Sequence, residues 1–344
     1  MSGSAGLGSE IAISVCIANY NGEYLLDECI SSIKNQDFPF PVEIIVHDDA
    51  STDASLEVLA ERYPDAVVIA SSKNVGYCLS NNRMAERARG KYLLLFNNDA
   101  TLREGALSAL FFAAEKASVP VALSLPQYDH VTLALVDRGV RLDLFHTPFA
   151  NAEEHCETLA YVQAACMIIA RDIWNGLGGF PNWMQSNAED AYLCTLIRLA
   201  GGRISVIEGS GYDHRQGQSF GGNRMSGEKI STTYRRRYLS ERNRASMVLV
   251  CTPTFVAWLA YIFHLSLLVI EGVLVSSVKF EFAVFKRIYL PAVVDSLARL
   301  SELVRARAHV QKMRRIGIWK YIRIFSPVPH KLRVLIRHGL PSIR

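Results

Sequence analysis

Three short polar clusters contain the side chains best suited to chemistry in this sequence. They are residues 18–21 (Ala-Asn-Tyr-Asn), 47–49 (His-Asp-Asp) and 97–99 (Asn-Asn-Asp), and each follows an apolar run. Carboxylate and amide oxygens bind hard divalent cations and accept hydrogen bonds. Asn and Asp are also ordinary turn and helix-capping residues, so any one cluster alone is more often structural. Three such clusters in succession indicate one shared site that is suited to a cation.

The segments that carry these clusters alternate between two patterns. Short apolar, β-branched runs predict strands at residues 11–17, 42–46, 66–70 and 92–96, and helices are predicted at 24–35, 54–62 and 79–88. This alternation predicts an α/β fold with a doubly wound, mostly parallel sheet and flanking helices. In such sheets ligands bind beyond the carboxyl ends of the strands, which is where the three clusters lie.

Other common site patterns are missing from the sequence. No GxGxxG follows the first strand and no GxxxxGK[ST] occurs, so dinucleotide and P-loop sites are not supported. The seven cysteines are scattered and never spaced as CxxC, which argues against a zinc knuckle or a disulfide framework and favours a reducing, cytoplasmic compartment. Residues 1–10 are rich in Gly and Ser, so we expect a flexible N-terminus and not a secretory signal.

The charge of the chain is distributed unevenly. Residues 286–344 contain 14 Lys and Arg against 2 Asp and Glu, a net charge of +12, and the total of +4 leaves −8 for residues 1–285. An acidic body with a basic tail argues against a nucleic-acid-binding protein and favours a local anionic target for the tail. Phospholipid headgroups suit the tail best, because a long apolar segment precedes it.

Five motifs, in order, resemble glycosyltransferase family 2, whose members have the GT-A fold. They read ISVCIANYNGEYLLDECISSIKNQ, EIIVHDDASTDAS, NVGYCLSNNRMAERARGKYLLLFNNDA, AACMIIARDIWNGLGGF with AEDAYLCTLIRLAGGRISVI, and GYDHRQGQSF with YLSERNRASMVL. The resemblance covers residues 11–250 and is strongest to the rhamnosyltransferase-like enzymes of bacterial cell-envelope polysaccharide assembly. It implies metal-dependent, inverting transfer of a sugar from a nucleotide-diphosphate sugar, with dTDP-rhamnose or a UDP-sugar favoured, to a lipid-linked glycan or polysaccharide.

The resemblance assigns a metal site to Asp99 and His214. Asp99 matches the last Asp of the family's DxD-like motif, which reads Asn97-Asn98-Asp99 here, so one carboxylate stands where many members have two. His214 matches a histidine that the family often adds, although a single His is otherwise commonly structural. The expected ion is Mg²⁺ or Mn²⁺, which would neutralise the charge of the leaving diphosphate.

The same resemblance places the donor base and ribose at the strand ends. Ala18 and Tyr20 would lie near the base, and Asp49 would accept a hydrogen bond from the base imide N–H. Asn98 would lie near the ribose, whereas Asp48 is expected to support the loop.

Two residues of the segment that resembles the family's donor loop would contact the diphosphate, namely Asn82 and Arg83. The alternative is that Arg83 forms a solvated helix face together with Arg87 and Arg89.

A catalytic base is expected at the adjacent acidic residues Glu189 and Asp190. Inverting transfer needs one carboxylate to remove the acceptor proton. The family pattern gives this role to Asp190, with Glu189 holding the acceptor or shaping the loop. These residues also suit the first turn of a helix, so the alternative is a purely structural N-terminal cap.

The last third of the chain differs in character, and we expect domains at 1–10, 11–250 and 251–344. Residues 255–278 contain only His264 and Glu271 as ionisable side chains and are long enough to span a bilayer. A single span would put the basic tail on the opposite side from the catalytic domain, against the positive-inside tendency. We therefore expect an in-plane or re-entrant helix followed by interfacial amphipathic helices, the alternative being a buried helix of a homo-oligomer.

Three other functions fit the sequence less well. A processive polysaccharide synthase usually has a QxxRW-type motif and several spans, and a nucleotidyltransferase would need a Gly-rich basic start. A non-catalytic nucleotide-sugar- or glycan-binding relative would not need both Asp99 and Asp190. The expected protein is a glycosyltransferase at the cytoplasmic face of the bacterial inner membrane, peripheral or monotopic, with no nucleic-acid partner.

Overall fold

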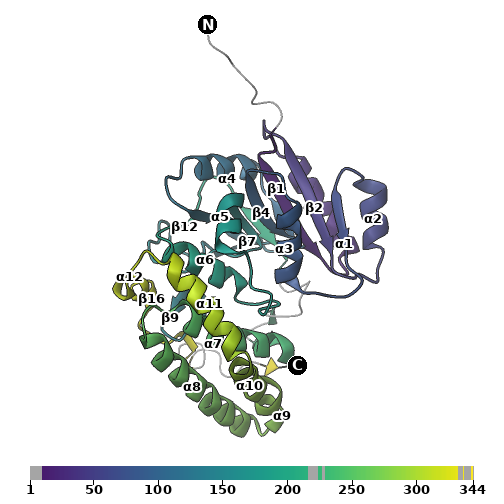
Figure 1. The fold of residues 1–344 in the computed structure, drawn as a ribbon. Coiled ribbons are helices and arrows are strands. Elements are labelled where there is room, and N and C mark those ends of the chain that lie inside the picture. The colour runs from purple at the N-terminus through teal and green to yellow at the C-terminus, as the bar shows by residue number, and fades with distance from the viewer. Residues whose placement is uncertain (1–9, 216–223, 227–228, 332–335, 337–341, 344) are drawn as a thin grey trace.

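A central mixed β-sheet organises the first two thirds of the chain (Figure 1). The computed structural model describes residues 10–215, 224–226, 229–331, 336 and 342–343. The described strands of the sheet run in the order β12-β6-β11-β4-β1-β2-β3, and only β11 is antiparallel to its neighbours. The strands are β1 (Ile13–Asn19), β2 (Val42–Asp48), β3 (Val67–Ala70), β4 (Tyr92–Asn97), β6 (Val121–Ser124), β11 (Cys166–Ala170) and β12 (Arg203–Val206).

Helices cover both faces of this sheet because its central strands are apolar on both sides. In β4, Leu94 and Phe96 belong to one hydrophobic core and Leu93 and Leu95 to the other, as the two-residue period of a strand requires. The first core includes α1 (Glu23–Lys34), α2 (Ser55–Arg62) and α4 (Ala106–Glu115). The second includes α3 (Tyr77–Arg87), α5 (Arg171–Leu177) and α6 (Glu189–Leu199). The predicted α/β fold is confirmed.

Three small sheets join distant parts of the described chain. One has the order β5-β13-β7-β8, from Ala100–Leu102, Tyr212–His214, Gln127–Asp129 and Leu135–Asp137. A second has the order β10-β9-β16, from Pro148–Ala150, Val140–Asp143 and Phe325–Ser326. The third contains β14 (Arg224–Ser226), β15 (Lys229–Thr232) and β17 (Ser342–Ile343). The last two bring the C-terminal segment back to the rest of the molecule.

The C-terminal helices follow α7 (Tyr234–Cys251) in the chain, and most of them pack against it. They are α8 (Val256–Lys279), α9 (Phe282–Val284), the π-helical turn η1 (Phe285–Tyr289), α10 (Leu290–Ala298), α11 (Leu300–Met313) and α12 (Ile318–Ile322). Helices α8, α10 and α11 and the turn η1 all contact α7. Gly272 lets η1 approach α8, because a Cβ there would lie 2.7 Å from Cβ of Tyr289. Among the described residues, α8 is the one helix long and apolar enough to cross a membrane.

Candidate active site

The carboxyl ends of β1, β2 and β4 meet at the side chain of Asn19. Its Nδ2 donates to Oδ2 of Asp48 at 3.1 Å, and its Oδ1 accepts from Nδ2 of Asn98 at 2.8 Å. Gly22 is required beside this contact, since a Cβ there would lie 2.3 Å from Nδ2 of Asn98 and 2.4 Å from Oδ1 of Asn19. The three polar clusters at residues 18–21, 47–49 and 97–99 therefore lie together at one edge of the central sheet.

The two carboxylates at the end of β2 bind backbone N–H groups. Oδ1 of Asp48 accepts from the backbone N of Ser51 at 3.0 Å, which supports the turn after the strand. The oxygens of Asp49 accept from the backbone N of Val75 at 2.7 Å and of Gly76 at 2.8 Å. Asp49 is buried and connects β2 to the segment that begins α3. Each carboxylate oxygen keeps a second lone pair that can accept from a ligand.

The other predicted donor-binding residues lie in different surroundings. Tyr20 is 44% exposed just beyond β1, and Ala18 is partly buried in the strand. Asn82 binds the loop before α6, donating to O of Phe180 at 2.7 Å and accepting from the Phe180 backbone N at 3.0 Å. Asn82 thus has a structural role that the sequence did not indicate.

Arg83 points to the ends of β2 and β3. Its Nη1 donates to Oγ of Ser71 at 2.6 Å and lies 3.2 Å from Nε2 of His47. His47 is buried, and burial lowers the pKa of its imidazole, with the charge of Arg83 contributing in the same direction. The guanidinium therefore lies at the sheet edge, and not on a fully solvated helix face.

Asp99 and His214 are brought together by the pairing of β5 with β13. The register places Ala100 opposite His214, so the residue before the strand, Asp99, reaches the imidazole. Oδ1 of Asp99 lies 3.0 Å from Nε2 of His214, and both residues are buried. Nδ2 of Asn97 lies 3.4 Å from the same nitrogen.

Gln127 of β7 holds the other side of the imidazole. Its Oε1 lies 3.3 Å from Nδ1 of His214 and accepts from the hydroxyl of Tyr212 at 2.7 Å. An Nδ1–H that donates to this oxygen would leave the lone pair of Nε2 facing Asp99. Sequence analysis did not indicate Gln127, because its strand is three residues long and lies outside the family motifs.

This pair fits a divalent cation. A carboxylate oxygen and an imidazole nitrogen suit Mn²⁺, and Mg²⁺ is commonly held by one or two carboxylates together with substrate phosphates. Within the described ranges no group of three or more His, Cys, Asp and Glu side chains is arranged to hold a metal. Among the described residues the site therefore offers two protein ligands, and a bound cation would take its remaining ligands from outside the protein.

The acidic pair lies where the sequence predicts it, in the first turn of a helix. Helix α6 begins at Glu189 and follows Ala188, which has a φ of 71°. Oδ1 of Asp190 accepts from the backbone N of Ala191 at 2.7 Å, and Oε2 of Glu189 is buried with no hydrogen-bond partner among the described residues. Burial raises the pKa of both carboxyls, and for Glu189 the charge of Asp190 adds to this rise, whereas Arg236 opposes it.

The buried carboxyl of Asp137 interacts electrostatically with members of both the acidic pair and the metal pair. Asp137 accepts from Nε2 of Gln163 at 2.6 Å and from the backbone N of Gly139 at 2.9 Å. Burial raises the pKa of Asp137 to about 6, and the carboxyl interacts with the charges of both His214 and Asp190. The sites that the sequence predicted for the metal and the base are thus within electrostatic range of the same group.

Helix α7 holds the loop that leads into α6. Nδ2 of Asn243 donates to O of Met184 at 3.0 Å, of Ser186 at 2.9 Å and of Asn187 at 2.7 Å. Nη2 of Arg242 donates to O of Met184 at 2.9 Å, and both side chains are buried. The loop has non-glycine residues in the left-handed region, namely Gln185 (φ 64°), Asn187 (φ 69°) and Ala188 (φ 71°). Such strain persists only where surrounding contacts enforce it.

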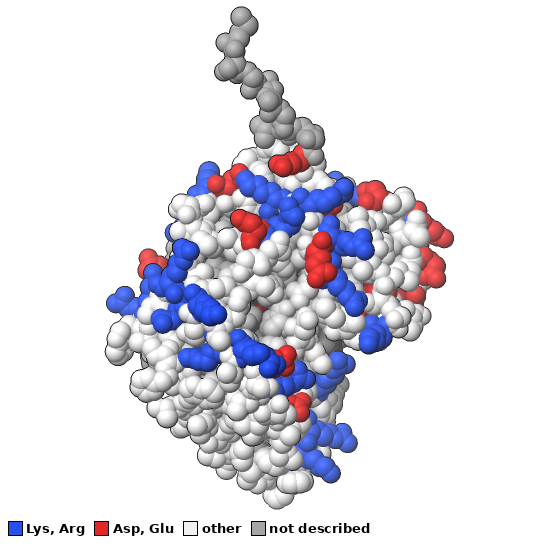
Figure 2. Space-filling view, viewed as in Figure 1, with Lys and Arg blue, Asp and Glu red and all other residues white. Residues whose placement is uncertain are grey.

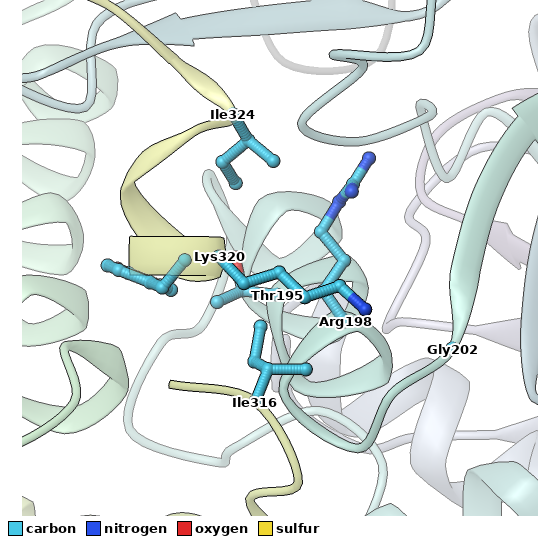
Figure 3. A pocket seen from close by; sticks show the side chains of 7 residues that line it. Thr195, Arg198, Gly202, Ile316, Lys320 and Ile324 are labelled. Carbon is cyan, nitrogen blue, oxygen red and sulfur yellow. The ribbon is translucent and has the colours of Figure 1, made fainter. Parts of the chain in front are cut away.

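A small cavity lies outside this site, between α6 and the C-terminal segment (Figure 3). It has a volume of about 40 Å³. Its lining consists of Thr195, Arg198, Gly202, Ile316, Lys320, Tyr321 and Ile324. A volume of that size is too small for a ligand as large as a nucleotide.

The sequence matches a family model and several curated proteins. Residues 14–169 match the model described as Glycosyl transferase family 2. A poly(ribitol-phosphate) beta-glucosyltransferase from Bacillus spizizenii is 38% identical over 100 residues, 28% of this chain and 16% of that protein. A GalNAc(5)-diNAcBac-PP-undecaprenol beta-1,3-glucosyltransferase from Campylobacter jejuni is 33% identical over 108 residues, 30% of this chain and 35% of that protein. The matched segments therefore span well under half of these relatives.

The fold is similar to that of solved glycosyltransferases. The structure of S. aureus TarS 1–349 in complex with UDP has a TM-score of 0.54 and 19% identity, covering 91% of this chain and 90% of that one. The mannosyltransferase PcManGT from Pyrobaculum calidifontis, in complex with GDP-Man and Mn²⁺, has a TM-score of 0.50 and 17% identity, covering 88% of each chain. At this identity the likeness concerns the fold alone. The coverage nevertheless extends beyond the central sheet into the C-terminal helices.

Proposed function

We propose that this chain, which contains a glycosyl transferase family 2 domain over residues 14–169, transfers a sugar from a nucleotide-diphosphate sugar to a lipid-linked glycan or a polysaccharide. The observation that carries the proposal is the pair Asp99–His214, 3.0 Å apart beside the shared edge of β1, β2 and β4. Either dTDP-rhamnose or a UDP-sugar is the proposed donor. More specifically, we propose that the transferred sugar is rhamnose and that the product belongs to a cell-envelope polysaccharide.

Asp99 and His214 would hold Mg²⁺ or Mn²⁺. When bound, the ion would act as a Lewis acid that offsets the charge developing on the diphosphate. Around it, the polar edge would bind the donor, with Tyr20 and Asp49 at the base and Asn98 towards the ribose. Arg83 offers a cation at the same edge for the diphosphate, since its guanidinium reaches Ser71 and His47 at the strand ends.

Asp190 is the proposed base for an inverting transfer. It would take the proton of the acceptor hydroxyl as that oxygen bonds to the sugar and the bond to the diphosphate breaks. Burial raises the pKa of the Asp190 carboxyl, which makes it a stronger base than an exposed aspartate. Glu189 lies beside it and is proposed to shape the acceptor side. Asn243 binds the carbonyls of Ser186 and Asn187 just before the pair, which supports a role of this loop in orienting both carboxyls.

A position at the cytoplasmic face of a bacterial inner membrane suits this reaction. The apolar helix α8 and the basic residues after it would keep the enzyme at a surface that holds lipid-linked acceptors. The Campylobacter jejuni relative is named for an undecaprenol-linked acceptor, which supports an acceptor of that class here.

The test is a panel of dTDP-, UDP- and GDP-sugars assayed for binding by calorimetry and for donor hydrolysis, each with Mg²⁺, with Mn²⁺ and with a chelator. We expect one nucleotide class to bind only when a metal is present. Asp99→Ala and His214→Ala should each weaken this binding at least tenfold, because one of the two protein ligands is lost. Metal-independent binding, or unchanged affinity in both variants, would refute the metal site.

A further inference from the structure

Helix α8 exposes an almost wholly apolar face. In this helix, which the structure describes in full, the exposed side chains are uncharged, and its charged residues Glu271 and Lys279 are only partly exposed. The exposed residues are Val256, Trp258, Leu259, Ile262, Phe263, Ser266, Val269, Ile270, Val273, Leu274, Ser277 and Val278. A surface helix in water normally has a polar outer face, so the outer face of α8 has the opposite polarity.

Neighbouring elements extend the apolar surface. Phe280 is 97% exposed and Phe282 is 70% exposed at the turn between α8 and α9. On α10, the side chains of Leu290, Val294 and Leu297 are each at least 43% exposed. Figure 2 shows a broad uncharged area over this lower part of the molecule, with Lys and Arg side chains along its margins, whereas a group of acidic side chains lies at the upper right of the view, over α2.

The inner face of α8 is bound too firmly for the helix to leave as a separate span. Glu271 pairs with Nζ of Lys331 at 2.6 Å and with Arg237 of α7 at 3.2 Å. The same cations bind Glu241, which is buried, at 3.2 Å and 2.7 Å respectively. Separating α8 from α7 would expose this network and leave buried charges unpaired.

The cations near the apolar surface complement an anionic lipid. Lys286 and Arg287 of η1 are exposed directly after the Phe280–Phe282 turn. Lys320 of α12 and Arg323, the residue that caps this helix, are exposed, and so is Trp319 of α12, at 81%. Lysine and arginine at the edge of an apolar face, with an exposed tryptophan, are typical of helices that lie in the headgroup region of a bilayer.

We propose that the outer face of α8, the Phe280–Phe282 turn and the exposed face of α10 form one docking surface for an anionic bilayer. Helix α8 lies parallel to the membrane plane with its apolar side chains at the boundary between headgroups and acyl chains, and the sheet stays in water. The proposal deepens the proposed function, because it defines the side from which a lipid-linked acceptor reaches the enzyme.

The test uses the full chain and the double variant Ile262→Glu/Leu274→Glu. Both side chains are at least 60% exposed, so the substitutions should not disturb folding, which circular dichroism checks. The matched control is Val131→Glu/Val119→Glu, which replaces exposed valines outside the C-terminal helices. Co-sedimentation with vesicles of phosphatidylcholine and phosphatidylglycerol should show binding of the wild type and the control, and at least hundredfold weaker partitioning of the double variant.

High salt should weaken wild-type binding without abolishing it, because screening removes only the electrostatic part. Equal partitioning of all three proteins would overturn the proposal. A second result would also overturn it: the wild type is a dimer in solution without vesicles, and the double variant is a monomer that still binds vesicles. The apolar face would then join two copies of the chain. Resistance to alkaline carbonate would indicate a true span and would also refute it. Donor hydrolysis without vesicles should be equal in all three proteins, which separates this proposal from the proposed chemistry.

Discussion

Asn243 is predicted to link the stability of the chain to its turnover. In Asn243→Ala, the carbonyls of Ser186 and Asn187 lose the donor that Nδ2 supplies, whereas the carbonyl of Met184 keeps Arg242. A buried carbonyl without a partner costs about 1–3 kcal/mol, so losing two partners should lower the free energy of unfolding by roughly 2–6 kcal/mol.

The loop should also move, because three of its residues are held at positive φ by these contacts. A shift of about 1 Å in a reacting group can cost on the order of a hundredfold in rate. We therefore expect turnover by the folded fraction to fall at least tenfold. Asn243→Asp keeps the shape of the side chain but loses both N–H donors, and it should be at least as damaging.

Urea denaturation and steady-state turnover measure the two effects separately. The control is Asn175→Ala, which changes an exposed asparagine on α5 and should alter stability by less than about 0.5 kcal/mol. If Asn243→Ala were destabilised but its folded fraction turned over normally, the loop would not position the acidic pair. If its stability were unchanged, the hydrogen bonds assigned to Asn243 would be wrong.

Two further predictions concern single ionisable groups. Asp190→Asn should lower turnover by roughly two to four orders of magnitude while donor affinity is retained, because the proposed base is lost. The control Asp172→Asn removes a carboxylate that makes the same local contact on α5, and it should leave turnover unchanged. Near-normal turnover of Asp190→Asn would exclude Asp190 as the base. Burial lowers the pKa of His146 to about 3, so between that pH and about 6.5 the unfolded chain binds a proton that the folded chain does not. The free energy of unfolding should therefore fall as the pH drops, by up to about 1.4 kcal/mol per pH unit. In urea denaturation His146→Phe should flatten this slope, whereas the control His309→Phe, at an exposed position, should not. An unchanged slope in both variants would contradict the lowered pKa of His146.

The sequence predicted the first hundred residues well, because their apolar runs have regular periods. The strand expected at 92–96 is Tyr92–Asn97, and the helix expected at 79–88 is Tyr77–Arg87. The start of α6 at Glu189 was also predicted, since acidic residues favour a first turn. Strands of three residues such as Pro148–Ala150 are too short to show a period and were not predicted.

The parts of the site that sequence could not reveal depend on contacts between distant segments. By composition, Glu-Arg-Asn-Arg at 241–244 is typical of a solvated helix face, yet all four side chains are buried. Their partners lie on a loop nearly sixty residues earlier and on the C-terminal segment. Likewise, a glutamine at position 127 does not indicate in the sequence that the imidazole of His214 lies beside it. For α8, length and apolar composition left open a spanning helix, an in-plane helix and a buried helix of a homo-oligomer, and its packing against α7 supports the proposed in-plane position over a separate span.

The pairing of β16 with β9 sets an order of events during synthesis. Phe325 pairs with Leu142, and the backbone N of His330 donates to Oδ2 of Asp143 at 2.7 Å. Until the ribosome has released residues 325–331, one edge of β9 has no neighbouring strand and Glu241 lacks Lys331. An unpaired edge is a template for aggregation. The nascent chain therefore has a vulnerable interval of more than 180 residues of translation, during which a chaperone or early contact with the membrane would favour correct assembly.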